Sequence, residues 1–267
     1  MSAFFKIATM ADRLGFRSLV ARGASLAYRD KSFEVDAQGR WINRQPEATF
    51  VSPSLHTATY SEVVNSVLGY WAWDYRPVAG DTVIDVGAGI GEDTVVFSRI
   101  VGPKGRVVSI EAHPATFECL QQTIKGSGLT NVTAVNCAIT DRDGEISISS
   151  GPNHVMNSVL GNDGDVSVPS RTLDSLADEL GIGEVALLKM NIEGAEKLAV
   201  QGFDRLAPRV RHAAISCHDF VAIHFGGADH FYTKEQVRAA LEARGFVIRE
   251  RPESPVSWVR DYLYASR

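Results

Sequence analysis

A glycine-rich turn directly after a short apolar run constrains the fold of this chain more than any other feature. Val83, Ile84 and Val86 are typical of a buried strand, and Gly87, Gly89 and Gly91 follow. Glycine at every second position permits a sharp turn and lets the backbone approach a ligand that a side chain would block. Residues 94–101 have the apolar pattern of a helix. The turn is therefore expected between a strand and a helix N-terminus.

An acidic residue lies 20 positions after the last of these glycines. Residues 106–110, Arg-Val-Val-Ser-Ile, form a second apolar run that ends in Glu111. A carboxylate at the tip of the second strand is placed to accept hydrogen bonds from both hydroxyls of a ribose. The turn, the spacing and the acidic strand tip together predict a nucleoside-type cofactor.

Four sequence stretches then match a known pattern. They are Ile84-Asp-Val-Gly-Ala-Gly-Ile-Gly91, Val101–Val108, Glu111-Ala-His-Pro114 and Lys189-Met-Asn-Ile-Glu-Gly-Ala-Glu196. As a set, over roughly residues 78 to 250, they resemble the FkbM family of S-adenosylmethionine-dependent O-methyltransferases. Two positions depart from the family: Gly89 stands where Asn is common, and Asn191 stands where Asp is common.

The resemblance implies S-adenosylmethionine as the cofactor and gives a role to each residue around the turn. Glu111 is expected to hold the ribose. Asp85 either orders the amides of the turn or faces the methionine ammonium group, and Asn136 is placed to approach the adenine edge. The expected cofactor-binding residues are Asp85, Gly87, Gly89, Gly91, Glu111 and Asn136.

Strand and helix patterns alternate through the rest of the chain, which predicts an α/β fold. Strands are expected near residues 81–86, 105–111, 131–139, 185–190 and 213–217, and an edge strand at 145–149. Helices are expected near 92–101, 114–126, 172–180 and 195–206, and after a capping box at Thr233–Gln236, closed by Gly245. Residues 151–165 read as a mobile loop, and 246–250 and 258–264 as a closing hairpin. We predict a Rossmann-like class I methyltransferase fold: a seven-stranded, mostly parallel sheet with an antiparallel last strand.

Residues 1–75 are interpreted as an N-terminal extension and residues 76–267 as the cofactor-binding domain. The extension has a possible first helix, a hairpin over 32–42 that turns at Gln38–Gly39, and a helix over 60–71. Four aromatic residues end it: Tyr70, Trp71, Trp73 and Tyr75. They either pack the extension against the sheet or form one wall of an acceptor pocket.

Charge and composition bear on the partners. A net charge of −5 argues against nucleic acid or an anionic membrane, since both favour clustered Lys and Arg. No run of about 18 apolar residues could span a bilayer. Three widely spaced cysteines and an N-terminus without the features of a secretory signal favour a cytoplasmic protein.

The acceptor end of the site is expected at the ends of two later strands. Glu193, His218 and Asp219 could bind Mg²⁺ or Mn²⁺, which would acidify a bound hydroxyl; the alternative is a hydrogen-bonded polar cluster without metal. The base is expected to be His154, in the loop over the cofactor, or His218.

The leading hypothesis is an O-methyltransferase that acts on a small-molecule hydroxyl, with a saccharide as the favoured acceptor. An NAD-dependent oxidoreductase is a second hypothesis, because an acidic strand tip serves either cofactor. In the usual glycine motif of NAD-dependent enzymes, two residues separate the last two glycines, whereas a single residue separates Gly89 from Gly91 here. A non-catalytic S-adenosylmethionine-binding module is the third.

Overall fold

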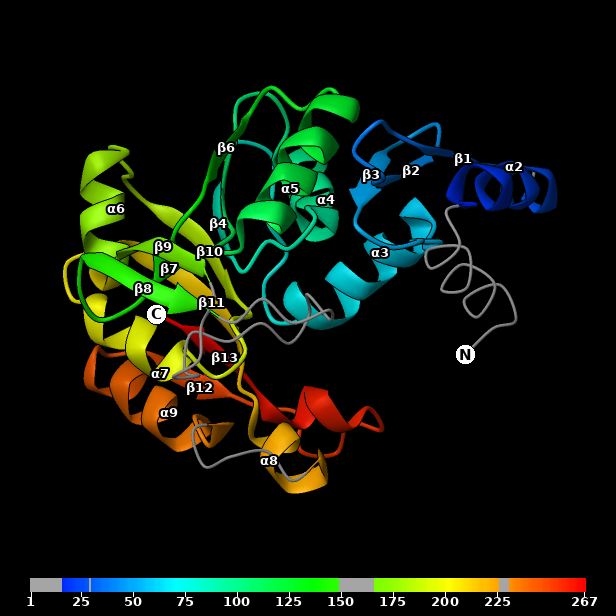
Figure 1. The fold of residues 1–267 in the computed structure, drawn as a ribbon. Helices are drawn as coiled ribbons and strands as arrows, with labels where there is room; N and C mark the ends of the chain where they lie inside the picture. The colour runs from blue at the N-terminus through cyan, green and yellow to red at the C-terminus, as the bar shows by residue number, and fades with distance from the viewer. Residues whose placement is uncertain (1–15, 29, 149–165, 226–230) are drawn as a thin grey trace.

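A seven-stranded sheet forms the centre of the molecule (Figure 1). The computed structural model describes residues 16–28, 30–148, 166–225 and 231–267. The strand order is β12-β13-β11-β10-β4-β5-β6, and β13 is antiparallel to both of its neighbours while the pairs from β11 to β6 are parallel. The strands are β4 (Thr82–Val86), β5 (Arg106–Ile110), β6 (Val132–Val135), β10 (Val185–Met190), β11 (Val210–Ser216), β12 (Val247–Arg249) and β13 (Tyr262–Ser266). The predicted sheet, with its antiparallel last strand, is confirmed.

Helices cover both faces of this sheet and bury its alternating side chains. On one face, Val83 and Leu187 join a core with α3 (Tyr60–Ser66), the π-helical turn η1 (Val67–Trp71) and α4 (Glu92–Val101). On the other face, Ile84 and Leu188 pack with α6 (Leu173–Glu179), α7 (Glu196–Ala199) and α9 (Lys234–Ala243). The remaining helical segments are α5 (Pro114–Gly126), α8 (Asp219–Phe225), η3 (Val200–Gly202), η4 (Ala207–Arg209) and η6 (Ser257–Asp261).

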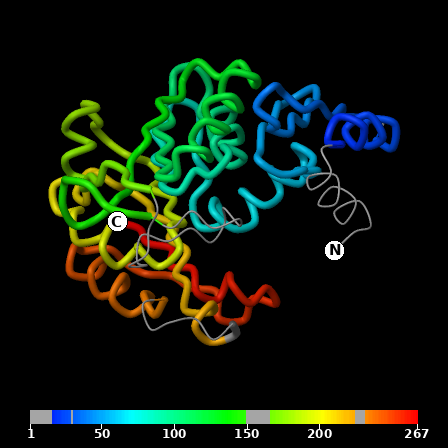
Figure 2. Tube along the Cα trace, in the orientation of Figure 1, coloured from blue at the N-terminus to red at the C-terminus, as the bar shows by residue number. Residues whose placement is uncertain are grey.

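The N-terminal extension lies to one side of the central sheet and its helices, and α3 connects it to them (Figure 2). It contains α2 (Arg17–Ala27) and a sheet of β1 (Ser32–Val35), β2 (Trp41–Arg44) and β3 (Thr49–Ser52). The hairpin turns at Gly39, whose φ of 79° is in the left-handed region, as expected. The third strand was not predicted. It is held by α5, because the hydroxyls of Thr123 and Ser127 accept hydrogen bonds from backbone N–H groups of β3. The division at residue 75 stays a prediction.

Three of the four aromatics at 70–75 pack against strands of the sheet. Trp71 stacks on Tyr262 with ring centroids 4.7 Å apart, and Trp73 lies against Tyr264 at 4.8 Å. Tyr75 stacks on His212 at 4.0 Å. These contacts support the packing interpretation.

Two predicted elements differ in the structure, and one further strand was not predicted. The strand expected at 131–139 is divided, because after β6 the chain leaves the main sheet. Its end, β7 (Ala138–Ile139), joins β8 (Gly144–Ile148) and β9 (Val166–Arg171) in a separate small sheet. β9 was missed because Pro169 and the polar residues around it do not have a strand pattern. The helix expected at 195–206 is only α7 and η3, since Gly202 packs directly against Thr172.

Candidate functional site

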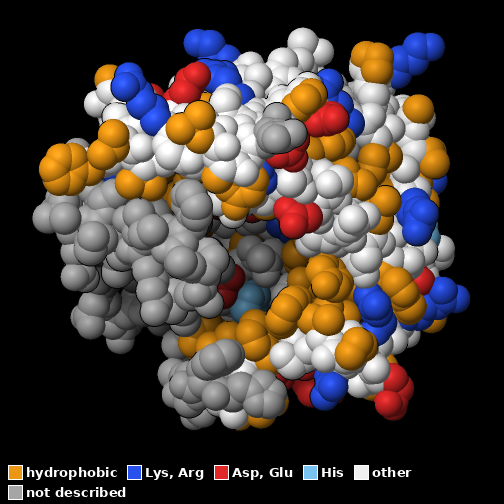
Figure 3. Space-filling model, turned by 90° about the vertical axis from the view of Figure 1, so that its right-hand side faces the viewer, with side chains coloured by type: hydrophobic (Ala, Val, Ile, Leu, Met, Phe, Trp, Pro, Cys, Tyr) orange, Lys and Arg blue, Asp and Glu red, His pale blue; other side chains and the backbone are white. Residues whose placement is uncertain are grey.

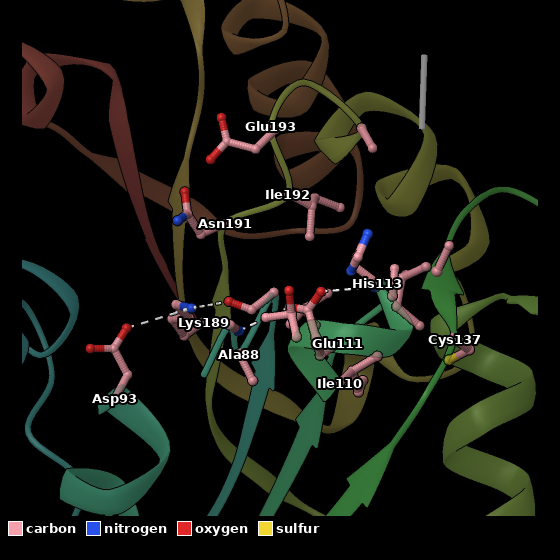
Figure 4. A pocket seen from close by; sticks show the side chains of 18 of the residues that line it. Ala88, Asp93, Ile110, Glu111, His113, Cys137, Lys189, Asn191, Ile192 and Glu193 are labelled. Atoms are coloured by element: carbon pink, nitrogen blue, oxygen red, sulfur yellow. Dashed lines mark hydrogen bonds and ion pairs between the residues drawn. The ribbon is translucent and has the colours of Figure 1, made fainter. Parts of the chain in front are cut away.

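A cavity of about 240 Å³ lies at the carboxyl ends of β4, β5 and β10. Parallel α/β sheets bind ligands at this edge. One end of the cavity is lined by Glu111 and His113, and the other by Asp93, with Lys189 between them (Figure 4). The side chains of Asn191 and Glu193 lie above Lys189 and Ala88 in the view of Figure 4. The apolar part of the lining is Ile110, Ala112, Cys137, Ala138, Ile139 and Ile148.

The glycine turn has the backbone that its sequence predicts. Gly87, Gly89 and Gly91 have φ values of 73°, 57° and 93°. A Cβ on Gly87 would lie 1.9 Å from the carbonyl oxygen of Asn191, so this position excludes any side chain. A Cβ on Gly89 would meet nothing within 4 Å. Because Asn tolerates the left-handed region better than most residues, the family's common Asn is compatible with position 89.

Glu111 connects the second strand to this turn. One of its carboxylate oxygens accepts a hydrogen bond from the N–H of Gly89 at 2.9 Å, and the other accepts one from the N–H of His113 at 2.9 Å. Burial raises the pKa of Glu111, while these two bonds oppose the shift. The carboxylate is therefore held rigidly at the cavity wall.

Asn136 supports Glu111 from behind. Its amide nitrogen donates to the carbonyl oxygens of Glu111 at 2.8 Å and Ala112 at 2.9 Å. The cavity is lined by its neighbour Cys137 and not by Asn136 itself. This geometry favours a positioning role over the expected contact with the adenine edge.

Asp85 is hidden beneath the cavity. It is register partner to both Lys189 and Ser109 on the neighbouring strands, so all three side chains lie on the α4 face of the sheet. Lys189 Nζ lies 2.8 Å from Asp85 Oδ1, and the Thr94 hydroxyl donates to Asp85 Oδ2 at 2.8 Å. Asp85 is 0% exposed and does not line the cavity, and these partners are side chains and not the amides of the turn, which differs from both expected roles. It acts on the turn through Lys189, which donates to the Gly87 carbonyl at 2.8 Å.

Asp93 is a cavity-lining carboxylate that sequence reasoning missed. It lies in the first turn of α4, and its carboxylate is 3.6 Å from Lys189 Nζ. Burial raises the pKa of Asp93 to about 7; Lys189 opposes this shift, and Asp85 and Glu92 add to it. Its position two residues after the last glycine of the turn is the sequence feature that could have identified it as a cavity residue.

A buried histidine organises the loop after β10. His218 Nδ1 lies 2.9 Å from Glu196 and its Nε2 lies 3.2 Å from Glu193. Glu196 also accepts hydrogen bonds from the backbone N–H groups of Ile192 and Gly194. Glu193 is thereby held at a φ of 52°, unusual for a residue other than glycine.

His218 is poorly suited to the two roles predicted for it. Burial acts to lower its pKa, but Glu196 and Glu193 outweigh burial and raise the pKa to about 10. At neutral pH the ring is protonated, and both nitrogens face carboxylates. A protonated imidazole offers no lone pair to a metal ion or to a substrate proton.

Asp219 is also engaged elsewhere. Its Oδ1 accepts hydrogen bonds from the backbone N–H groups of Thr233 at 2.8 Å and Lys234 at 3.0 Å. This contact caps α9, and the capping box predicted at Thr233 is absent because the Thr233 side chain makes no capping bond. The helix ends at Ala243, and Gly245 follows the C-cap Arg244 with a φ of 81°, in agreement with the predicted closing glycine. Within the described ranges of the chain, no group of three or more His, Cys, Asp or Glu side chains is arranged to hold a metal ion.

His154 and the loop 151–165 lie outside the described residues. In the part of the chain that is described, no helix is both long enough and apolar enough to cross a membrane.

The residues that line the cavity fit S-adenosylmethionine. Gly89 leaves the turn open to a close ligand, and Glu111 presents a fixed carboxylate beside it. The apolar lining behind Glu111 suits a purine ring, whereas Asp93, Asn191 and Glu193 make the opposite end polar.

Comparison with known proteins agrees with this geometry. Residues 85–248 match the family model of the methyltransferase FkbM domain. The crystal structure of the FkbM methyltransferase from Methylobacillus flagellatus KT is similar in fold, with a TM-score of 0.52 and 20% identity, over 75% of this chain and 47% of that chain.

Two curated relatives match shorter stretches. Protein-L-isoaspartate O-methyltransferase from Methanococcus maripaludis is 29% identical over 129 residues, which are 44% of this chain and 57% of that protein. Methyltransferase 1 from Beauveria bassiana is 24% identical over 156 residues, 49% of this chain and 62% of that protein. The chain thus spans less than two thirds of either relative.

Proposed function

The chain belongs to the FkbM methyltransferase family, and we propose that it transfers the methyl group of S-adenosylmethionine to a hydroxyl of a small molecule, with a saccharide as the acceptor class. The observation that carries this proposal is the bond between Glu111 and the N–H of Gly89. This bond places the carboxylate that we propose to bind the ribose beside the glycine turn, in the wall of the cavity.

Each part of the cofactor has a matching part of the cavity. Glu111 would accept the ribose hydroxyls, and the apolar lining around Ile110 and Cys137 would receive the adenine. The methionine portion would then lie beyond Ala88, towards Asp93 and Asn191. When bound, the cofactor supplies a methyl group made electrophilic by its sulfonium.

The acceptor would enter beside Glu193. Its carboxylate lines the cavity and is anchored by His218, so it can accept a hydrogen bond from the acceptor hydroxyl and orient it. His154 remains our candidate for the group that takes the hydroxyl proton, because the structure engages both nitrogens of His218. A His154→Ala variant that keeps full activity would remove it from this role.

Two features support a saccharide. Trp258 is 45% exposed and lies against Tyr70 with ring centroids 6.5 Å apart, so this pair offers an exposed aromatic surface, although neither residue lines the cavity. The face shown in Figure 3 is hollowed near its centre, where acidic and histidine side chains are visible. Acidic groups can accept hydrogen bonds from a polyhydroxylated ligand. The net charge of −5 favours such a ligand over nucleic acid.

Calorimetry of the full chain with S-adenosylhomocysteine and with NAD tests the cofactor. Binding of S-adenosylhomocysteine alone is expected, and binding of NAD alone would favour the oxidoreductase hypothesis. Transfer of labelled methyl groups across a panel of glycans tests the acceptor. Cofactor binding without transfer to glycans or to any other hydroxyl compound would favour the non-catalytic module.

A further inference from the structure

The charged cluster beneath and beside the glycine turn lacks one positive charge. Asp85, Asp93 and Lys189 face one another from β4, α4 and β10, at 2.8 Å and 3.6 Å from the single ammonium group. When all three are ionised, two carboxylates share one cation. Glu92 on α4 and Tyr262 on β13 also face Asp93, and neither supplies a positive charge.

Lys189 holds Asp93 less closely than it holds Asp85 and the Gly87 carbonyl. Its side chain is 2% exposed, and its ammonium group already contacts Asp85 and the Gly87 carbonyl at 2.8 Å each. The ring of Trp71 covers it at 4.9 Å. Asp93 is therefore the partner held most loosely by Lys189, and its carboxylate is the one that lines the cavity, with 21% of the side chain exposed.

We propose that Asp93 binds the α-ammonium group of the methionine portion of S-adenosylmethionine, an inference that rests on the proposed function. The ammonium group completes the cluster, so that two carboxylates then face two cations. Asp93 lies at the end of the cavity opposite Glu111, which is where the methionine portion lies when Glu111 holds the ribose (Figure 4).

This assignment replaces the one expected for Asp85. Asp85 is fully buried behind Lys189, so a ligand ammonium cannot reach it without displacing that side chain. The carbonyl of Gly87, another acceptor in the turn, already accepts a hydrogen bond from Lys189.

The protonation of Asp93 supports the same role. With a pKa of about 7 in the free protein, the carboxyl is only partly ionised at neutral pH. An ammonium group at hydrogen-bonding distance favours the ionised form and lowers the pKa. Binding is therefore accompanied by release of a proton.

The test compares two ligands by calorimetry. S-adenosylhomocysteine carries the ammonium group but no sulfonium, and 5′-methylthioadenosine lacks the whole amino-acid portion. We expect Asp93→Asn to weaken S-adenosylhomocysteine binding by about tenfold or more and to leave 5′-methylthioadenosine binding nearly unchanged. For the wild type, S-adenosylhomocysteine affinity should rise by about fivefold between pH 6 and pH 7.5, and Asp93→Asn should abolish this dependence.

Glu92→Gln is the matched control. Glu92 is the preceding residue of α4 and lines the same cavity, but its carboxylate lies 2.8 Å from His56 Nε2. We expect it to change the ratio of the two ligand affinities far less than Asp93→Asn does, because Glu92 acts on Asp93 only by raising its pKa. A thermal melt of Asp93→Asn checks that the variant is folded.

The outcomes separate this inference from the proposed function. If the wild type fails to bind S-adenosylhomocysteine, the proposed function is wrong. If the wild type binds it and Asp93→Asn binds it equally well, or loses both ligands equally, only the role of Asp93 is wrong.

Discussion

Lys189 and Asp85 are register partners on neighbouring parallel strands, and Lys189 Nζ lies 2.8 Å from Asp85 Oδ1. Both side chains are almost completely buried. The pair ties β10 to β4 directly below the glycine turn, and Lys189 continues the link to the Gly87 carbonyl. Burial alone would lower the pKa of Lys189, but Asp85 and Asp93 outweigh it and raise the pKa.

The first prediction concerns this pair. Lys189→Met should lower the free energy of unfolding by about 3–5 kcal/mol, because it leaves the Asp85 carboxylate buried without a cation. The double variant Asp85→Asn/Lys189→Met removes both charges and should recover much of the loss. Urea unfolding at pH 7 measures both, and equal losses in the two variants would contradict a paired role.

The second prediction compares two glycines of one turn. Gly87→Ala should destabilise the protein by about 3 kcal/mol or more, because its Cβ would overlap the Asn191 carbonyl at a positive φ. Gly89→Asn should cost no more than about 1 kcal/mol, since the space is open and Asn tolerates this backbone. Thermal unfolding measures both, and similar losses would show that the close approach to Asn191 is not limiting.

Local sequence patterns were sufficient to predict the sheet, the backbone of the glycine turn and the position of Glu111 at a strand end. These depend on alternation, on glycine spacing and on strand ends, which neighbouring residues determine. The partners of Asp219 could not be read in this way, because its contact with Thr233 joins two segments that only the tertiary fold brings together. The capping box was predicted from residue types that fit it, yet Asp219 supplies the cap instead.

The surroundings of Asp85, a residue within a single strand, likewise could not be predicted from local sequence patterns. Alternation places it on the face of Val83, but the sequence does not reveal that Lys189 stands at the same register on β10 and covers it. Asp93, on the helix that follows, lines the cavity where Asp85 does not. The division of the strand at 131–139 depends likewise on pairing between β7 and β9, which are far apart in the chain.

The third prediction concerns Glu111. Glu111→Ala should weaken S-adenosylhomocysteine binding by about 2–3 kcal/mol, since it removes two charge-assisted hydrogen bonds to the ribose. It also frees the N–H groups of Gly89 and His113, so a melt should accompany the calorimetry. Unchanged affinity in a folded variant would exclude Glu111 from the site.

The fourth prediction concerns stability and pH. The pKa of Asp93 is about 7 in the folded protein, above its ordinary value of 3.8. The folded state therefore binds more protons between these values, and stability falls as pH rises from about 4 to about 7. Asp93→Asn lacks this loss, so its melting temperature should exceed that of the wild type at pH 8 and match it near pH 4. A constant difference across this range would show that Asp93 does not titrate there.

The last prediction concerns the metal. A catalytic divalent ion lowers a barrier by several kcal/mol, so its removal reduces a rate by orders of magnitude. The residues expected to bind one are otherwise engaged: His218 lies between Glu193 and Glu196, and Asp219 caps α9. We therefore expect the initial rate of methyl transfer to be unchanged in EDTA.

The control for this experiment is the addition of Mg²⁺ or Mn²⁺ to the EDTA-treated enzyme. A rate that falls in EDTA and returns with either ion would restore the metal hypothesis. Glu196→Gln further distinguishes a metal-binding role of Glu193 from a role in orienting the acceptor. Glu196 contacts His218 and the backbone of the loop after β10 but does not line the cavity. If Glu193 orients the acceptor through this loop, Glu196→Gln should raise KM for the acceptor and leave the affinity for S-adenosylhomocysteine unchanged.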